Sequence, residues 1–232
     1  MIQEGDRHSP FLAGVDGCKS GWIVASETRS GQVAVDVVSC FSEVLRRDYR
    51  LLVVDVPIGL LEHGTRLADQ KARGLLKQRA CCVFTAPLRP MLDCADYPDA
   101  RKLRLQIEGK SLTRQAWAIM PKIKEVDAIL TPQAQARIRE GHPEVSFAHM
   151  NGGKALANSK HTANGRSDRI SLLTAHFPEI VSLVQTHSRV AEDVIDACAM
   201  LWSAHRIYNR QALALPEKSL ADARGLLMQI WV

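Results

Sequence analysis

The sequence predicts an α/β fold, built on a mixed sheet of about five strands that is flanked by helices and carries a mostly helical insertion. The order between residues 11 and 55 is strand, strand, strand, helix, strand, and the run LLVVDV is apolar without alternation, as in a central strand covered on both faces. At 232 residues and 46% hydrophobic, the chain can bury a full core but is short for two complete α/β domains. We therefore expect one domain over residues 1–232, with an insertion at 60–140.

The first three expected strands form an antiparallel meander. Their sequences are FLAGVDG, WIVASET and QVAVDVVS, and polar turns at CKSG and TRSG separate them. The helix FSEVLRRD then returns the chain to RLLVVDV, which can lie parallel to the first strand. This order is the opening of a ribonuclease-H-like sheet.

The insertion is expected to be helical and basic. From Arg66 to Arg114, basic residues outnumber acidic ones about two to one. The segment SLTRQAWAIMPKIKEVDAIL has helical periodicity, and Pro121 should kink that helix or split it in two. We interpret the region as a basic lid or a substrate platform.

The rest of the chain is expected to complete the sheet and cover it. The run HPEVSFAHMN alternates like a last strand, and Gly152 and Gly153 then turn the chain. Helices are expected at about 167–177, with Ser167 as N-cap, and at about 190–210. The tail DARGLLMQIWV should add a short edge strand.

The composition of the chain indicates the kind of partner and the cellular compartment to expect. A formal charge of +5 and a pI near 9.0 are weakly in favour of a polyanionic partner. The six cysteines have no metal-ligand spacing, which indicates a reducing cytosol. The N-terminus MIQEGDRHSP lacks an apolar signal core, and no apolar run is long enough to span a bilayer. We expect a cytoplasmic protein, neither secreted nor embedded in a membrane.

Four carboxylates are far apart in the sequence yet can converge in this fold. Asp16 ends FLAGVD, Asp55 ends LLVVD, and EDVIDA carries Asp193 and Asp196 on one helix face. In the expected sheet the ends of the first and fourth strands are neighbours, and the last helix packs across them. Such a cluster repels itself unless a hard cation neutralises it, and oxygen ligands suit Mg²⁺ or Mn²⁺ rather than Zn²⁺. These four residues are our candidate metal ligands.

Each acid also has a plain structural alternative. Asp16 before Gly17 fits a hairpin turn, and Asp55 before Val56 and Pro57 fits an Asx-turn. Acids such as Asp193 and Asp196 are favoured in the first turns of any helix. Only their joint placement favours a site.

Other polar residues are candidates for the same site. Glu144 opens the expected last strand and could bind metal or orient water, or simply lie at an exposed strand entrance. His142 could shuttle a proton or be a loop residue. The candidates for binding phosphate, each also compatible with a solvated surface, are Arg79, Arg89, Lys122, Lys160, Arg166 and Arg169.

Seven sequence blocks follow one another along the chain: GVDGCKSGW, VVDVPIGL, RACCVFTAPLR, SLTRQAWAIMPKIKEVD, HPEVSFAHMNGG, SKHTANGR and DVIDA. In this order they closely resemble domain-of-unknown-function family 429, described as predicted nucleases with a ribonuclease-H-like fold. The resemblance covers nearly the whole chain and implies that the acidic positions hold two divalent ions. The first block reads CKSGW where CRGGW is the common form, which leaves Asp16 intact.

The function we expect is metal-dependent phosphodiester hydrolysis on DNA or RNA, with Asp16, Asp55, Glu144, Asp193 and Asp196 as catalytic residues. Actin-like ATPases and sugar kinases share this sheet and use an Asp-Gly turn, so a nucleotide-binding phosphotransferase is an alternative. Those enzymes usually need two such domains. A third possibility is a non-catalytic binding module, whose sign would be missing acids.

Overall fold

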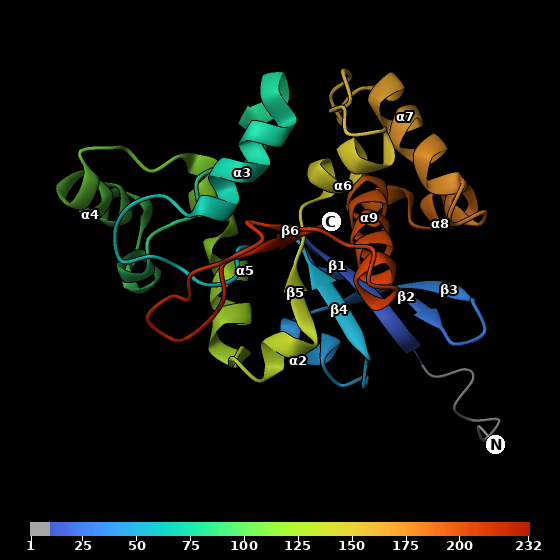
Figure 1. The fold of residues 1–232 in the computed structure, drawn as a ribbon, viewed down its shortest axis with the longest axis horizontal. Coiled ribbons are helices and arrows are strands. Elements are labelled where there is room, and N and C mark those ends of the chain that lie inside the picture. Colours follow the sequence, from blue (N-terminus) through green and yellow to red (C-terminus); the bar gives the residue numbers. More distant parts are fainter. Residues whose placement is uncertain (1–9) are drawn as a thin grey trace.

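The computed structural model describes residues 10–232 and contains a mixed seven-stranded sheet with helices on both faces (Figure 1). The order across the sheet is β3-β2-β1-β4-β5-β7-β6. The strands are β1 (Pro10–Cys18), β2 (Gly21–Thr28), β3 (Val33–Val38), β4 (Leu51–Val54), β5 (Ile138–Glu140), β6 (Ala214–Leu215) and β7 (Ile230–Trp231). The α/β class is as predicted, but the count of five strands is wrong because the C-terminal segment adds β6 and β7.

The first half of the sheet follows the predicted order. β1, β2 and β3 are an antiparallel meander, and the short helix α2 (Phe41–Val44) leads to β4, which pairs with β1 in parallel. β4 in turn pairs with β5 in parallel. The carboxyl ends of β1, β4 and β5 therefore meet at one edge of the sheet.

The segment HPEVSFAHMN is a helix, not the last strand. It forms α6 (Pro143–Met150), and the strand before it is β5. Pro143 occupies the first helical turn, where its fixed φ favours a helix start. Every residue from Pro143 to Ala148 is buried, so α6 has no polar face to reveal a helical period. The tail also differs from expectation, since β7 lies between β5 and β6, and β6 is the edge strand.

The remaining helices differ from the predicted ones mainly at their ends. They are α3 (Leu67–Leu76), α4 (Tyr97–Glu108), α5 (Arg114–Ile129), α7 (Ala163–Thr174), α8 (Ile180–Thr186) and α9 (Ala191–Tyr208). α7 begins earlier than predicted, and its cap is Thr162, whose hydroxyl accepts from the Gly165 N–H at 3.1 Å; Ser167 lies inside the helix.

Pro121 does not split α5, which runs unbroken through it. Buried Ala116 and Met120 before the proline, and Ile123 and Val126 after it, pack in the same apolar cluster, which holds the two halves of the helix together. The range 60–140 overlaps the sheet at its end, because Ile138–Glu140 is β5. Its helices α3, α4 and α5 gather on one side of the view in Figure 1.

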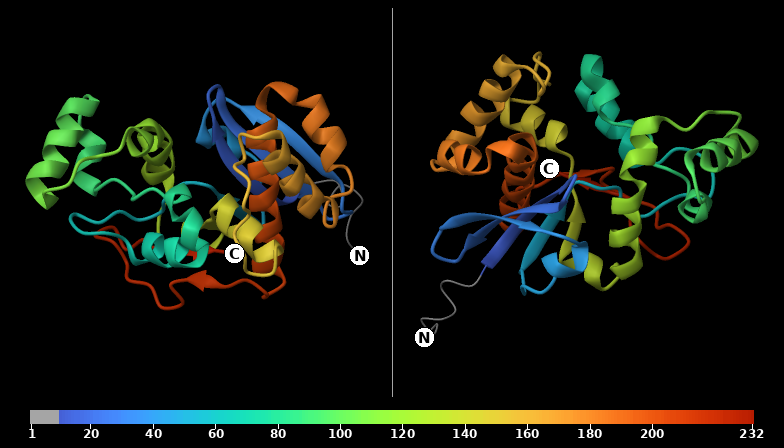
Figure 2. Two further views of the ribbon diagram at one scale, coloured as in Figure 1. Left: turned by 90° about the horizontal axis from the view of Figure 1, so that it is seen from above. Right: turned by 180° about the vertical axis from the view of Figure 1, so that it is seen from behind.

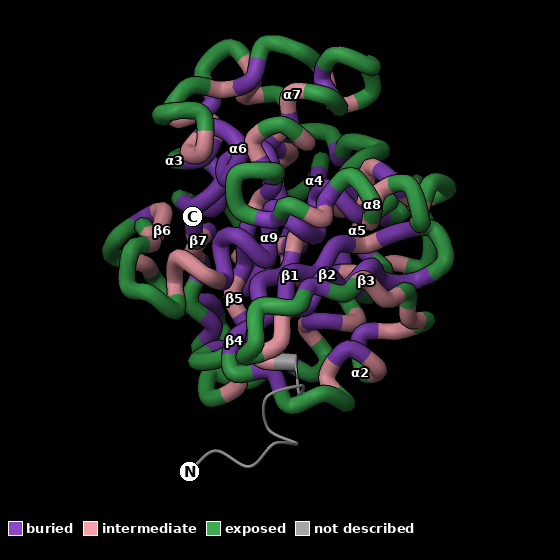
Figure 3. Tube along the Cα trace, turned by 90° about the vertical axis from the view of Figure 1, so that its right-hand side faces the viewer, coloured by how far each residue is buried: buried purple, intermediate pink, exposed green. Residues whose placement is uncertain are grey.

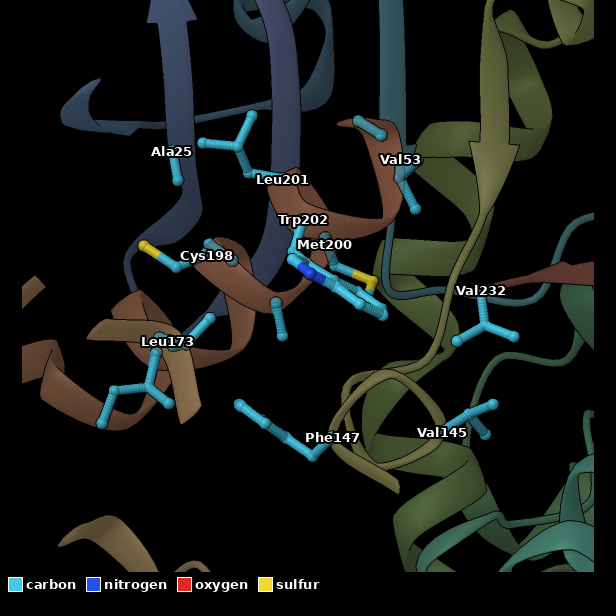
Figure 4. Close-up of a cluster of buried hydrophobic side chains, with 14 of the residues drawn as sticks. Ala25, Val53, Val145, Phe147, Leu173, Cys198, Met200, Leu201, Trp202 and Val232 are labelled. Carbon is cyan, nitrogen blue, oxygen red and sulfur yellow. The ribbon is translucent and has the colours of Figure 1, made fainter. Parts of the chain in front are cut away.

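Two apolar layers sandwich the sheet. One contains α9, α6 and α7 packed on alternate residues of the strands; the other contains α2 and α5, which lie over the sheet when it is seen from behind (Figure 2). Figure 3 shows that the central strands and α9 are buried beneath an exposed outer surface. In the first layer, Met200 and Trp202 of α9 lie on the side of Phe147 and Val145 of α6, and Leu201 lies beside Ala25 of β2 (Figure 4).

A close approach of backbones fixes α9 on β1. A Cβ atom at Gly14 would lie 2.0 Å from the Leu201 nitrogen and 2.1 Å from the Ala197 oxygen, so only glycine allows this contact. α9 packs against β1, β2 and β4, which places its first two turns over the carboxyl ends of β1 and β4.

Two expectations concern the membrane and the N-terminus. Among residues 10–232, none of the helices has the length and apolar character needed to cross a membrane. Residues 1–9, most of the segment from which the absence of a signal was predicted, lie outside the described residues.

Candidate active site

Asp16 and Asp55 stand at the same level on neighbouring parallel strands. Val15 pairs with Val54, and the Asp55 N–H donates to the Val15 carbonyl at 2.9 Å, so each aspartate is the next residue beyond that pair. Because side chains alternate along a strand, both aspartates lie on the face of Gly14 and Val53, which is the α9 face. Asp16 pairs with Ile23 inside the β1–β2 ladder, so it is not a hairpin-turn residue.

The helix α9 brings Asp196 to this pair. The Asp196 side chain is 2% exposed and accepts from the Lys160 Nζ at 2.6 Å through Oδ2. Its other oxygen, Oδ1, is buried and has no hydrogen-bond partner among the described residues. Asp193, one turn earlier, is partly buried and borders the group.

The charges of these carboxylates interact strongly. Burial first, and then repulsion from Asp55 and Asp196, raise the pKa of Asp16 well above its usual value. Burial and then Asp196 raise the pKa of Asp55 to about 7. The pKa of Asp193 and that of Asp196 are also raised, mainly by burial. The protein without a bound cation therefore opposes full ionisation of the cluster.

Glu144 lies beside the aspartates but at the start of α6. Its buried carboxylate accepts from the Arg169 Nη2 at 2.5 Å and Nε at 3.2 Å, both through Oε1. Arg169 is 1% exposed, lies over the Phe147 ring and also donates to the Gly165 carbonyl at 2.7 Å. Arg169 is therefore a buried partner of Glu144 and is not free to bind a substrate, contrary to the prediction.

His142 lies beside Glu144, and both residues line the same pocket. Burial lowers the pKa of His142, so its imidazole is neutral near pH 7, and its buried Nδ1 has no partner among the described residues. A neutral imidazole with a free nitrogen can accept a proton.

A pocket of about 440 Å³ opens beside Asp55 and Asp196, between the insertion and the segment that carries α6 and α7, and Asp16 and Asp193 are not among its lining residues. Its walls include six residues that were predicted from the sequence, namely Asp55, Arg79, His142, Glu144, Lys160 and Asp196. The lining residues that sequence reasoning missed are Cys81, Cys82, Phe84, Gln115, Pro143, Ser159 and His161. Several of these stand inside the quoted blocks, but nothing in their spacing indicates a shared pocket.

The other basic candidates lie apart from this pocket. Arg89 donates to Asp127 at 3.1 Å and to Asp222 at 2.5 Å, so it ties the insertion to the C-terminal segment. Lys122 lies over the Trp22 ring at 4.6 Å, with its stem 3.3 Å from a Cβ placed on Gly17.

Arg166 is exposed and pairs with Glu192 at 3.3 Å. Of the six predicted phosphate ligands, the structure thus places Arg79 and Lys160 at the pocket.

The donors fit a hard cation by their chemistry. Asp16, Asp55 and Asp196 offer carboxylate oxygens whose pKa values are raised, and Asp196 keeps an unpartnered buried oxygen, which a cation would satisfy. Over residues 10–232, no group of three or more His, Cys, Asp or Glu side chains is closed tightly enough to hold a metal ion. Lys160 occupies the Oδ2 atom of Asp196, and the Oδ1 atom stays without a partner among the described residues.

The fold is a mixed α/β fold, and comparison with family models places the chain in a family. It belongs to the family described as "Protein of unknown function (DUF429)", whose model matches residues 14–221. The family resemblance predicted from the sequence is confirmed. No curated protein and no solved structure matches the chain.

Proposed function

We propose that this protein is a divalent-metal-dependent phosphodiesterase that acts on nucleic acid, on a ribonuclease-H-like sheet. The order β3-β2-β1-β4-β5, with β1, β4 and β5 parallel and β2 and β3 antiparallel, supports the fold. The observation that carries the function is the convergence of Asp16, Asp55 and Asp196 from two strands and a helix, with one buried Asp196 oxygen left unpartnered.

Asp16, Asp55 and Asp196 would hold Mg²⁺ or Mn²⁺, with Asp193 at the border of the group. A bound divalent cation supplies stabilisation of the charge that develops on the phosphate during hydrolysis. Carboxylates kept apart from water and close to each other are a costly arrangement in a purely structural role, and a cation removes that cost.

The neighbouring residues supply the remaining functions. Arg79 lines the pocket, and its Nε is buried without a partner in the described part of the chain, which suits a phosphate oxygen. His142, neutral and with a free nitrogen, accepts a proton from the attacking water. Arg169 holds Glu144 through Oε1, which positions that carboxylate beside the pocket.

The test compares Asp16→Asn with a surface control, Asp48→Asn, whose carboxylate is exposed and pairs with Arg137. Cleavage of single-stranded, duplex and branched oligonucleotides is measured with Mn²⁺ and with a chelator. We expect Mn²⁺-dependent cleavage by the wild type and by Asp48→Asn, and none by Asp16→Asn. The metal-free melting temperature of Asp16→Asn should be unchanged or raised, because one repelling charge is removed.

Two results would contradict the proposal. Cleavage that persists in chelator would remove the cation from the chemistry. A fully active Asp16→Asn variant would return Asp16 to a structural role.

A further inference from the structure

Lys160 places a positive charge inside the acidic group. It lies between α6 and α7, two residues before the Thr162 cap, and its ammonium donates to Asp196 at 2.6 Å. The Asp196 side chain is 2% exposed, whereas that of Lys160 is 37% exposed. The carboxylate is therefore buried in the interior, whereas the lysine side chain that reaches it is partly exposed to solvent.

The ammonium acts on the whole group and not on one partner alone. Its charge counters the rise in pKa of Asp16, Asp55, Asp193 and Asp196, the same four carboxylates predicted to bind metal. Arg169, the other buried cation nearby, is committed to Glu144. Lys160 thus occupies, electrostatically, the position that a divalent cation would take.

We propose that Lys160 is an internal counter-ion that competes with the divalent cation, so that metal binds by displacing the ammonium from Asp196. This inference rests on the proposed function of the same site. Two positive charges near one carboxylate repel each other, so both cannot hold Asp196 at full strength. The partly exposed lysine can move, whereas the buried aspartate cannot.

Displacement has two consequences for the site. In the metal-free protein the ammonium offsets part of the negative charge of the group, and metal affinity is set lower than the carboxylates alone would give. After displacement the ammonium remains tethered at the wall of the pocket, next to Ser159 and His161, where a phosphate of the substrate would lie.

The experiment measures Mn²⁺ affinity of the full chain by calorimetry at fixed pH and ionic strength. Lys160→Gln and Lys160→Met remove the charge, and Lys160→Arg keeps it. Lys102→Met is the matched control, because Lys102 is an exposed residue of α4, which lies far from α9 in Figure 1. It removes the same net charge away from the acidic group.

We expect Lys160→Gln and Lys160→Met to bind Mn²⁺ about tenfold more tightly than the wild type, since a repelling charge within a few ångströms is removed. Lys160→Arg and Lys102→Met should stay within about twofold of the wild type. Lys160→Gln retains an N–H donor for Asp196, which protects its folding if Lys160→Met is unstable. A charge-removed variant that melts early without metal and is rescued by millimolar Mn²⁺ also supports the inference.

Different results would contradict the competition by Lys160 and the proposed metal site. If the wild type binds Mn²⁺ and Lys160→Gln binds it equally or more weakly, the competition is wrong and the proposed site stands. If neither the wild type nor any Lys160 variant binds Mn²⁺, both the competition and the proposed metal site are wrong.

Discussion

At the scale of the residue, Asp55 makes the stability of the metal-free protein depend on pH. Its pKa is raised to about 7 in the folded protein, against an ordinary value of 3.8. A carboxyl group whose pKa is raised by folding contributes stability that is fully present when the pH is below its pKa in the unfolded chain. This contribution is lost as the pH rises toward 7. The direction is opposite to that of an ordinary salt-bridged aspartate.

The comparison of Asp55→Asn with the wild type isolates this effect from the titration of the histidines. In chelator the asparagine variant should melt only slightly higher than the wild type at pH 5, where Asp55 is still protonated in the folded protein and ionised only in the unfolded chain. At pH 8 the asparagine variant should melt a few degrees higher, because it carries no buried charge. A gap that stays constant between pH 5 and pH 8 would show that Asp55 titrates at an ordinary pKa.

Arg169 and Arg166 offer a contrast between a buried and an exposed arginine on one helix. Arg169→Met leaves the buried Glu144 charge without its partner and should cost ~3–5 kcal/mol of unfolding free energy. Arg166→Met breaks an exposed pair and should change it by less than about 1 kcal/mol. Chemical denaturation of both variants is the check, and equal small losses would refute the buried role of Arg169.

The sequence was sufficient to find the acids but not the partners of the arginines. Asp16 and Asp55 each end an apolar strand, and that position could be recognised from the local pattern. The partners of Arg89 are Asp127 and Asp222, which come from other parts of the chain, so its structural role depends on tertiary contacts.

At the scale of the element, the contact between α9 and β1 determines whether the acids meet. Gly14→Ala would place a Cβ atom 2.0 Å from the backbone of α9, and backbone cannot swing aside as a side chain can. We expect a loss on the order of 3 kcal/mol or more, together with weaker Mn²⁺ binding as Asp196 is pushed away.

Gly74→Ala is the control for that change. Gly74 lies inside α3, and a Cβ there meets nothing within 4 Å, so alanine should stabilise the protein by about 0.5–1 kcal/mol. Thermal melts and Mn²⁺ titrations of the two variants are measured side by side. A Gly14→Ala variant with wild-type stability and metal affinity would contradict the close approach.

Among the elements, the meander, β4 and α9 could be predicted because each has a clear apolar pattern bounded by turns. The strand β5 could not, since its three residues, Ile138–Glu140, are too short to show a period. The prediction therefore moved the last strand to the next segment, which is the buried helix α6. A helix buried on all sides loses the amphipathic signal by which sequence analysis recognises it.

At the scale of the whole molecule, the insertion contributes Arg79 to the pocket while Arg89 holds the insertion to the C-terminal segment. Arg79→Met should weaken oligonucleotide binding and reduce the slope of its salt dependence by about one unit, as for the loss of one phosphate contact. Arg101→Met, at an exposed position of α4, should leave both unchanged. Fluorescence anisotropy across a salt series gives the two slopes, and equal slopes for both variants would assign Arg79 to ordinary surface.

The function proposed above requires that Asp16, Asp55 and Asp196 form one divalent-cation site. The most direct measurement is a crystal structure of the protein soaked in Mn²⁺, with anomalous difference density used to locate the metal. We expect a peak bounded by these three carboxylates, with the Lys160 ammonium moved away from Asp196. Well-ordered carboxylates with no peak between them, and Lys160 still bound to Asp196 at saturating Mn²⁺, would contradict it.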